Sequence, residues 1–120
     1  MLDLSFINLY VADAAASTAF YADLLGGGPT MDTPGFSAFT MPSGLTLGLW
    51  TRDAVEPVTS DGQAGACEIC FAVADTDAAH DDWKARGLTI IQPPTTMGFG
   101  RTFTALDPDG HRLRVFTPPA

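Results

Sequence analysis

The sequence predicts an α+β fold of two tandem βαβββ units, which together form a curved, cup-shaped mixed sheet with the helices on its outer face. Three observations lead to this prediction. A strand pattern, a helix pattern and further strand patterns follow one another in the first half, and the same order returns in the second. Val11-Ala12-Asp13 recurs as Val73-Ala74-Asp75. Residues 39–44 and 103–110 are also similar, and both end in a turn glycine. A duplicated unit explains all three; the alternative is chance similarity within a generic α+β domain.

The first unit is expected over residues 1–52, within a single domain of 120 residues that buries one shared core. Residues 5–11 alternate with the two-residue period of a strand. Asp13 follows as a helix N-cap, because its carboxylate can accept a hydrogen bond from a free backbone N–H. Apolar residues then recur at helical spacing until the glycine run at 26–28 ends the helix. Two further strands are expected at 36–41 and 45–50, with a turn at 42–44.

The second unit is expected over residues 66–120, after a polar linker at 53–65 that contains Pro57, Ser60 and Gly62. A strand at 67–73 leads to Asp75 as the helix N-cap, and the helix ends near Gly87. The remaining strands are expected at 88–92, 102–106 and 111–116, and the turn Asp107-Pro108-Asp109-Gly110 joins the last two.

The composition excludes several classes of partner. A net charge of −8 repels phosphate backbones and anionic membrane surfaces, so neither a nucleic acid nor a membrane is expected as a partner. No apolar segment approaches the roughly 20 residues that span a bilayer. The N-terminus lacks the basic stretch and apolar run of a signal peptide, so the cytoplasm is the expected location.

The two cysteines, Cys67 and Cys70, form a C-x-x-C within an alternating stretch. Positions three apart in a strand face opposite sides, so the two thiols should point apart. A single C-x-x-C without a second pair is weak evidence for a zinc or redox site. Two buried, structural cysteines are therefore expected.

Strand alternation also assigns the residues of each unit to two faces. Aliphatic residues of one face should pack under the helix. The opposite face mixes aromatic rings, an amide, a carboxylate and two guanidinium groups, which is typical of a ligand cavity rather than of a core. Its members are Phe6, Asn8, Tyr10, Thr46, Gly48 and Trp50 in the first unit, and Glu68, Cys70, Ala72, Arg112, Arg114 and Phe116 in the second.

The chain resembles the vicinal-oxygen-chelate superfamily, which includes glyoxalase I, extradiol dioxygenases and bleomycin-resistance proteins. The resemblance is carried by residues 9–13 with the following Phe20-Tyr21, and by the closing stretch 106–116 around Asp107-Pro108-Asp109-Gly110. Within the superfamily, residues 47–50 and 98–103 look most like small phenazine- or bleomycin-resistance proteins. The resemblance implies a homodimer in which units of two chains share cavities.

Enzymes of this superfamily usually hold a divalent metal with His and Glu at four positions on the cup side. The resemblance places Phe6, Gly48, Glu68 and Arg114 at these positions. One of the four can ligate a metal, and a metal site needs at least three donors. No metal and no cofactor are therefore expected. His80 on the second helix and His111 after the turn are read as surface or edge histidines.

Glu68 and Arg114 have two interpretations. They can form a semi-buried ion pair that closes the vacated metal site, or they can present hydrogen-bonding groups to a ligand's carboxylate or hydroxyl. The rings of Trp50, Phe36 and Phe99 can stack on a flat ligand, and glycines beside the last two would leave them free to move over a mouth. The alternative for the three rings is a place in the core or in a subunit interface.

The leading hypothesis is a non-catalytic protein that binds and sequesters a planar aromatic small molecule, such as a phenazine- or bleomycin-like antibiotic. No Ser or Cys can be placed beside a His, so no catalytic residues are assigned. The alternative is a glyoxalase-like lyase or isomerase, or a dioxygenase, with an unusual metal site or with Glu68 as a general base. A third possibility is a cup filled by its own side chains in a protein that acts through a partner. The predicted ligand-binding residues are Phe6, Asn8, Phe36, Trp50, Glu68, Phe99 and Arg114.

Overall fold

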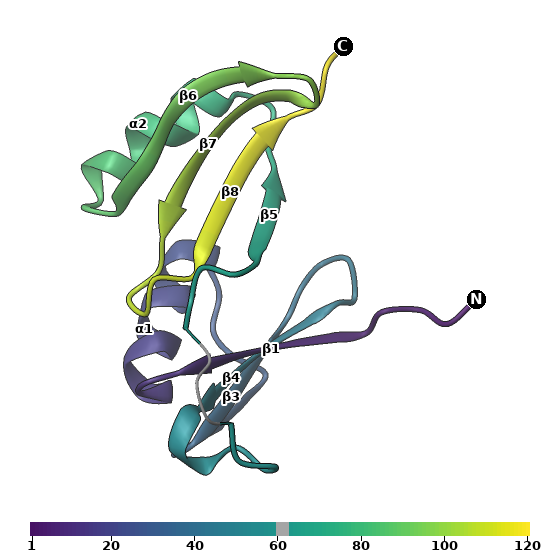
Figure 1. Cartoon of the computed structure of the whole chain (residues 1–120), viewed down its shortest axis with the longest axis vertical. Helices are drawn as coiled ribbons and strands as arrows, with labels where there is room; N and C mark the ends of the chain where they lie inside the picture. Colours follow the sequence, from purple (N-terminus) through teal and green to yellow (C-terminus); the bar gives the residue numbers. More distant parts are fainter. Residues whose placement is uncertain (60–62) are drawn as a thin grey trace. The chain divides into compact units, whose positions relative to one another are not determined.

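A computed structural model describes residues 1–59 and 63–120 of the chain. It contains two units, Met1–Gly62 and Gln63–Ala120, and each unit places one helix against a four-stranded mixed sheet (Figure 1). This arrangement confirms the predicted α+β class and the two βαβββ units. Ser60 and Gly62, which were expected in the linker, lie outside the described residues.

The first unit has the strand order β1-β4-β3-β2, in which β1 runs parallel to β4 and the other neighbours are antiparallel. Its elements are β1 (Phe6–Val11), α1 (Ala14–Leu25), β2 (Met31–Thr33), β3 (Phe36–Thr40), β4 (Thr46–Thr51) and a 3₁₀ turn (Arg52–Ala54). The sequence did not predict β2, because its three residues are all exposed and carry no alternation of buried and exposed positions.

The ends of α1 follow from two residues. The Asp13 side chain accepts a hydrogen bond of 3.0 Å from the Ala15 N–H, which confirms the predicted N-cap. Gly26 takes the left-handed conformation with φ of 79°, and its N–H donates to the Ala22 carbonyl. A residue with a Cβ is disfavoured in that conformation, so the helix ends at the glycine.

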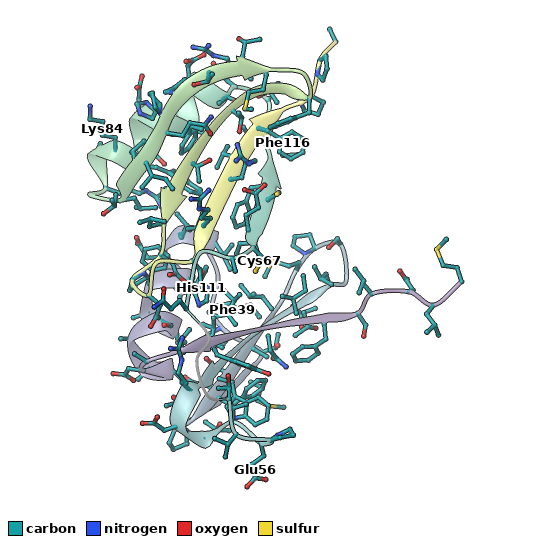
Figure 2. The ribbon with its side chains drawn as sticks, in the orientation of Figure 1. Phe39, Glu56, Cys67, Lys84, His111 and Phe116 are labelled. Carbon is teal, nitrogen blue, oxygen red and sulfur yellow. The ribbon has the colours of Figure 1, made fainter. Side chains whose placement is uncertain are left out.

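The core of the first unit lies between α1 and its sheet. Leu9, Val11, Leu47 and Leu49 are buried on the side of the sheet that the helix covers, as the alternation predicted. Phe39 joins them from β3 (Figure 2). The hydroxyls of Thr18 on α1 and Ser37 on β3 are hydrogen-bonded, so a polar contact fixes the helix to the sheet in addition to the apolar packing.

The second unit repeats the design with the strand order β5-β8-β7-β6. Its elements are β5 (Glu68–Ala72), α2 (Thr76–Ala85), β6 (Thr89–Met97), β7 (Gly100–Leu106) and β8 (Arg112–Thr117). The Asp75 side chain caps α2 by accepting a hydrogen bond of 3.1 Å from the Ala78 N–H. Strand β6 is longer than predicted because it continues through Pro93 and Pro94. It is an edge strand, and its pairing with β7 shifts register around these two residues. Edge strands and irregular pairing are the places where a sheet tolerates proline.

The core of the second unit centres on Phe103, Ala105 and Val115, with the Trp83 ring edge-on to Phe103 at 5.4 Å. The His80 ring also packs edge-on against Phe103, with the ring centres 5.4 Å apart, and its side chain is 14% exposed. His80 was interpreted as a surface or edge histidine; α2 turns its ring toward the sheet, and the side chain remains partly exposed.

The turn between β7 and β8 is organised by Asp107. Its side chain is buried, and Oδ1 accepts hydrogen bonds from the N–H groups of Asp109 and His111 at 2.9 and 2.8 Å. Figure 2 shows His111 at this turn. A short carboxylate that bonds its own backbone in this way stabilises a tight turn, as the Asp-Pro-Asp-Gly sequence predicted.

The two cysteines are exposed free thiols, so the prediction that they are buried was wrong. Cys67 lies where the chain enters β5 (Figure 2), and Cys70 lies on β5 itself. Strand β5 is an edge strand with a neighbour on one side, so alternation alone did not guarantee that either thiol would be covered. In the described parts of the chain, no helix is long and apolar enough to cross a membrane.

Candidate functional site

The face of the first sheet opposite α1 contains a hollow of about 330 Å³, lined by Phe6, Asn8, Phe36 and Trp50. In each unit, we call the face of the sheet opposite the helix the helix-free face. Strand pairing brings the lining residues together, because Asn8 lies opposite Gly48 and Trp50 lies opposite Phe36. All four belong to the predicted set of ligand-binding residues.

Three aromatic rings form the walls of the hollow. The Phe6 and Phe36 rings are nearly parallel, with centres 6.4 Å apart and planes at 21°. The Trp50 ring stands edge-on to Phe36, with the ring centres 6.1 Å apart. Phe36 is the first residue of β3, and it is held between Phe6 and Trp50.

Gly48 lies beneath these side chains in the centre of β4. A Cβ at this position would overlap Asn8 Oδ1 and would lie 2.8 Å from Phe6 Cε1 and 3.0 Å from Phe36 Cε1. Contacts this close are repulsive, so the hollow requires the absence of a side chain at position 48. Strand alternation placed Gly48 on this face but could not reveal this role.

The helix-free face of the second sheet is built around Arg114. Its Nε donates a hydrogen bond of 2.8 Å to Glu68 Oε1, so the two residues do form the expected ion pair. Its Nη1 donates to Gln92 Oε1 and to Thr102 Oγ1, both at 3.1 Å. The Arg114 side chain is 16% exposed and the Glu68 side chain 33% exposed, so the pair is only partly shielded from water.

Gln92, Thr102 and Thr104 complete this polar cluster, and sequence reasoning missed them. The Thr104 hydroxyl donates a hydrogen bond of 3.0 Å to Gln92 Oε1. The alternation of threonines with Phe103 along β7 was a usable signal, since Thr102 pairs with Phe116 and Thr104 with Arg114. No comparable signal existed for Gln92, because β6 shifts register on both sides of it.

The polar cluster changes the acidity of two groups. The hydrogen bond from Arg114, helped by its charge, holds the pKa of the Glu68 carboxyl below its ordinary value despite the opposing effect of burial. Burial, and then the nearby Glu68 carboxylate, raise the pKa of the Cys70 thiol. Glu68 is therefore an anion at neutral pH, and Cys70 is a protonated thiol that lies 3.7 Å from Glu68 Oε1.

Phe99 covers the guanidinium group of Arg114. The Arg114 Cζ lies 5.6 Å from the centre of the Phe99 ring, a cation–π distance, and Phe116 stands edge-on to Phe99 at 6.3 Å. Phe99 occupies the turn between β6 and β7, and it is 44% exposed. The predicted residues thus fall into two groups: an aromatic hollow in the first unit, and Glu68, Phe99 and Arg114 together in the second.

The residues at the positions where the resemblance implies metal ligands do not fit a divalent metal. Phe6 and Gly48 have no side-chain donor atom for a metal, and Arg114 binds the one carboxylate of the four positions, Glu68, through its own N–H. Among residues 1–59 and 63–120, no three His, Cys, Asp or Glu side chains lie close enough to hold a metal ion. His80, which packs on Phe103 on the helix side of the sheet, is not placed to contribute.

Comparison with known proteins identifies the family. The model of the Glyoxalase/Bleomycin resistance protein/Dioxygenase superfamily matches residues 3–115. The chain is 32% identical over 111 residues to the phenazine antibiotic resistance protein EhpR of Enterobacter agglomerans. The alignment covers 89% of this chain and 85% of that protein.

Solved structures share the fold of this chain. The solution NMR structure of protein ATC0852 from Agrobacterium tumefaciens is 45% identical, with a TM-score of 0.86 and full coverage of both chains. The crystal structure of a glyoxalase-related enzyme from Fulvimarina pelagi has the same fold at 21% identity, with a TM-score of 0.85 over 99% of this chain and 90% of that one. The chain therefore belongs to the Glyoxalase/Bleomycin resistance protein/Dioxygenase superfamily.

Proposed function

We propose that this protein binds and sequesters a planar aromatic small molecule, an antibiotic of the phenazine or bleomycin type, without converting it chemically. The observation that carries this proposal is the hollow of about 330 Å³ with walls formed by Phe6, Phe36 and Trp50. This volume is at the lower end of the range for small-molecule pockets. Aromatic walls favour a flat ligand, because each stacked or edge-on ring pair adds on the order of 1 kcal/mol beyond the buried area.

The similarity to a phenazine antibiotic resistance protein supports the same ligand class. A protein that only binds such a compound protects a cell by lowering the concentration of free drug. Such a protein needs no catalytic residue.

The alternative enzymatic function has less support from these residues. A general base works best when its pKa is near the working pH. Arg114 holds the pKa of Glu68 below its ordinary value, which makes the carboxylate a weaker base. The same hydrogen bond engages Oε1, one of the two oxygens of this carboxylate.

Tryptophan fluorescence tests the proposal, because the chain has two tryptophans in different surroundings. Trp50 lines the hollow, whereas Trp83 packs on Phe71 and Phe103 in the core of the second unit. Phenazine and bleomycin would be titrated into the variant Trp83→Phe, in which Trp50 is the reporter. We expect saturable quenching at micromolar concentrations of one of these compounds, and calorimetry should give the same affinity.

The variant Trp50→Phe is the matched control, since its remaining reporter lies away from the hollow. Its emission should change much less on addition of the same compound. If neither compound quenches Trp50 and calorimetry detects no binding, the proposed function is wrong. If recovered compound is chemically altered after incubation, binding is part of an enzymatic reaction and the non-catalytic proposal is excluded.

A further inference from the structure

The amide of Asn8 is a polar group in an otherwise aromatic hollow. It shares the lining with Phe6, Phe36 and Trp50. No hydrogen bond joins its side chain to another residue in the described part of the chain. Amide side chains that are enclosed by apolar groups normally have a partner. In the free protein water can supply that partner, because Asn8 is exposed to solvent.

A ligand that fills the hollow displaces this water and must replace its hydrogen bond. An uncompensated amide costs about 1–3 kcal/mol in proteins, which is enough to change the choice of ligand. The Asn8 amide offers both an N–H donor and a carbonyl acceptor. Among the described residues, the lining has no charged side chain, so a charged group would lose its hydration there without gaining a counter-charge.

Gly48 determines how close a ring can come to this amide. Its missing side chain leaves the space into which Asn8 Oδ1 and the edges of Phe6 and Phe36 converge. Any side chain at position 48 must displace these atoms, and the flexible Asn8 amide is the first that can move. A larger residue would therefore both shrink the hollow and turn the amide away from its present position.

We infer that Asn8 and Gly48 set the specificity of the hollow for an uncharged, flat heteroaromatic ring that presents a ring nitrogen or a carbonyl oxygen to the Asn8 amide. This inference rests on the proposed function and adds the chemical class of the ligand edge. The aromatic walls hold the ring by stacking, and the amide distinguishes a heterocycle from a hydrocarbon of the same shape.

Two bicyclic probes of matched shape test the inference: quinoxaline, which has ring nitrogens, and naphthalene, which has none. The ¹⁵N-labelled full chain would be titrated with each, and binding followed by the chemical shifts of the Trp50 indole N–H and the Asn8 side-chain amide. We expect quinoxaline to bind about fivefold more tightly than naphthalene, which is the factor that one ordinary hydrogen bond contributes. Only quinoxaline should shift the Asn8 side-chain amide strongly.

Three variants separate the roles of the residues. Asn8→Leu should remove the preference for quinoxaline while retaining naphthalene binding. Gly48→Ala should weaken both probes about tenfold, because the added methyl group pushes the side chains above it into the hollow. Gly27→Ala is the matched control; a Cβ there meets no atom within 4 Å, and both affinities should stay as in the parent chain.

Each outcome bears on a different statement. Equal affinities for the two probes, or a preference that survives in Asn8→Leu, would overturn the inference and leave the proposed function intact. An unchanged affinity in a folded Gly48→Ala variant would overturn the role of Gly48. Failure of both probes to shift Trp50 in the parent chain would instead contradict the proposed function itself, and the inference with it. The dispersion of the NMR spectrum shows whether each variant is folded.

Discussion

Arg114 connects three strands of the second sheet through one guanidinium group. It bonds Glu68 on β5, Gln92 on β6 and Thr102 on β7 from its own place on β8. Such a cluster is stable only while its acceptors remain in place, because a partly shielded guanidinium group without a partner is costly. Glu68 supplies the compensating negative charge, so it is the residue whose removal should be felt most.

The prediction at this position concerns Glu68→Gln and its dependence on pH. The pKa of Glu68 is lower in the folded chain than in the unfolded chain. Its contribution to stability is therefore fully present above the ordinary glutamate pKa and is lost as the pH falls through the lower, folded value. We expect the substitution to lower the free energy of unfolding by about 1 kcal/mol at neutral pH, a value limited by solvent screening. The difference between parent and variant should shrink as the pH falls below the ordinary glutamate pKa.

Urea unfolding at a series of pH values measures this difference. Glu56→Gln is the matched control, since Glu56 is exposed and points away from the ribbon (Figure 2). Its effect should be within about 0.5 kcal/mol at every pH. A pH-independent loss of stability in Glu68→Gln would show that packing, rather than the charge of the carboxylate, explains the effect.

The hairpin of β6 and β7 positions Phe99 over this cluster, and its geometry depends on one glycine. Gly100 has φ of 131°, which residues with a Cβ avoid. A Cβ there would also overlap the Thr117 carbonyl oxygen and lie 3.1 Å from the Thr117 carbonyl carbon. Both obstacles are backbone atoms of the neighbouring segment, so they cannot move as a side chain can.

We therefore expect Gly100→Ala to destabilise the chain by about 2–4 kcal/mol, through backbone strain and a backbone clash together. Gly98→Ala in the same turn is the matched control, because a Cβ there meets no atom within 4 Å and φ is not in the left-handed region. Chemical denaturation of both variants measures the contrast. Equal and small effects would mean that the hairpin relaxes at Gly100 without cost.

Most elements could be predicted from the sequence because each carries its own local signal. The alternation in β1 and the aspartates before α1 and α2 act over a few residues, and the structure confirms them. Strand β2 has no such signal, because it is exposed and depends on its pairing with β3. Whether Cys67 and Cys70 are buried or exposed could not be predicted either, because this depends on what covers an edge strand rather than on the strand itself.

The same distinction explains the candidate site. Alternation placed Phe6, Asn8 and Trp50 on one face, and pairing in the sheet does bring them around one hollow. It could not reveal the role of Gly48, which appears only when the neighbouring side chains are placed in space. It also could not place Gln92 beside Arg114, because irregular pairing in β6 determines that contact.

At the scale of the whole molecule, both helix-free faces expose large apolar residues in a single chain. Phe6 is 45% exposed, Tyr10 38% and Phe99 44%. We propose that these residues are covered in a homodimer, which the family resemblance implies. Light scattering should then give twice the 12.6 kDa mass of one chain at micromolar concentrations.

Tyr10→Glu should weaken association at least about tenfold, because a carboxylate at a buried interface loses its hydration without a partner. Ala19→Glu, on the exposed side of α1, adds the same charge away from the sheet and should leave the dimer intact. A single-chain mass for the parent protein would exclude the dimer, and equal dissociation in both variants would attribute the effect to net charge instead.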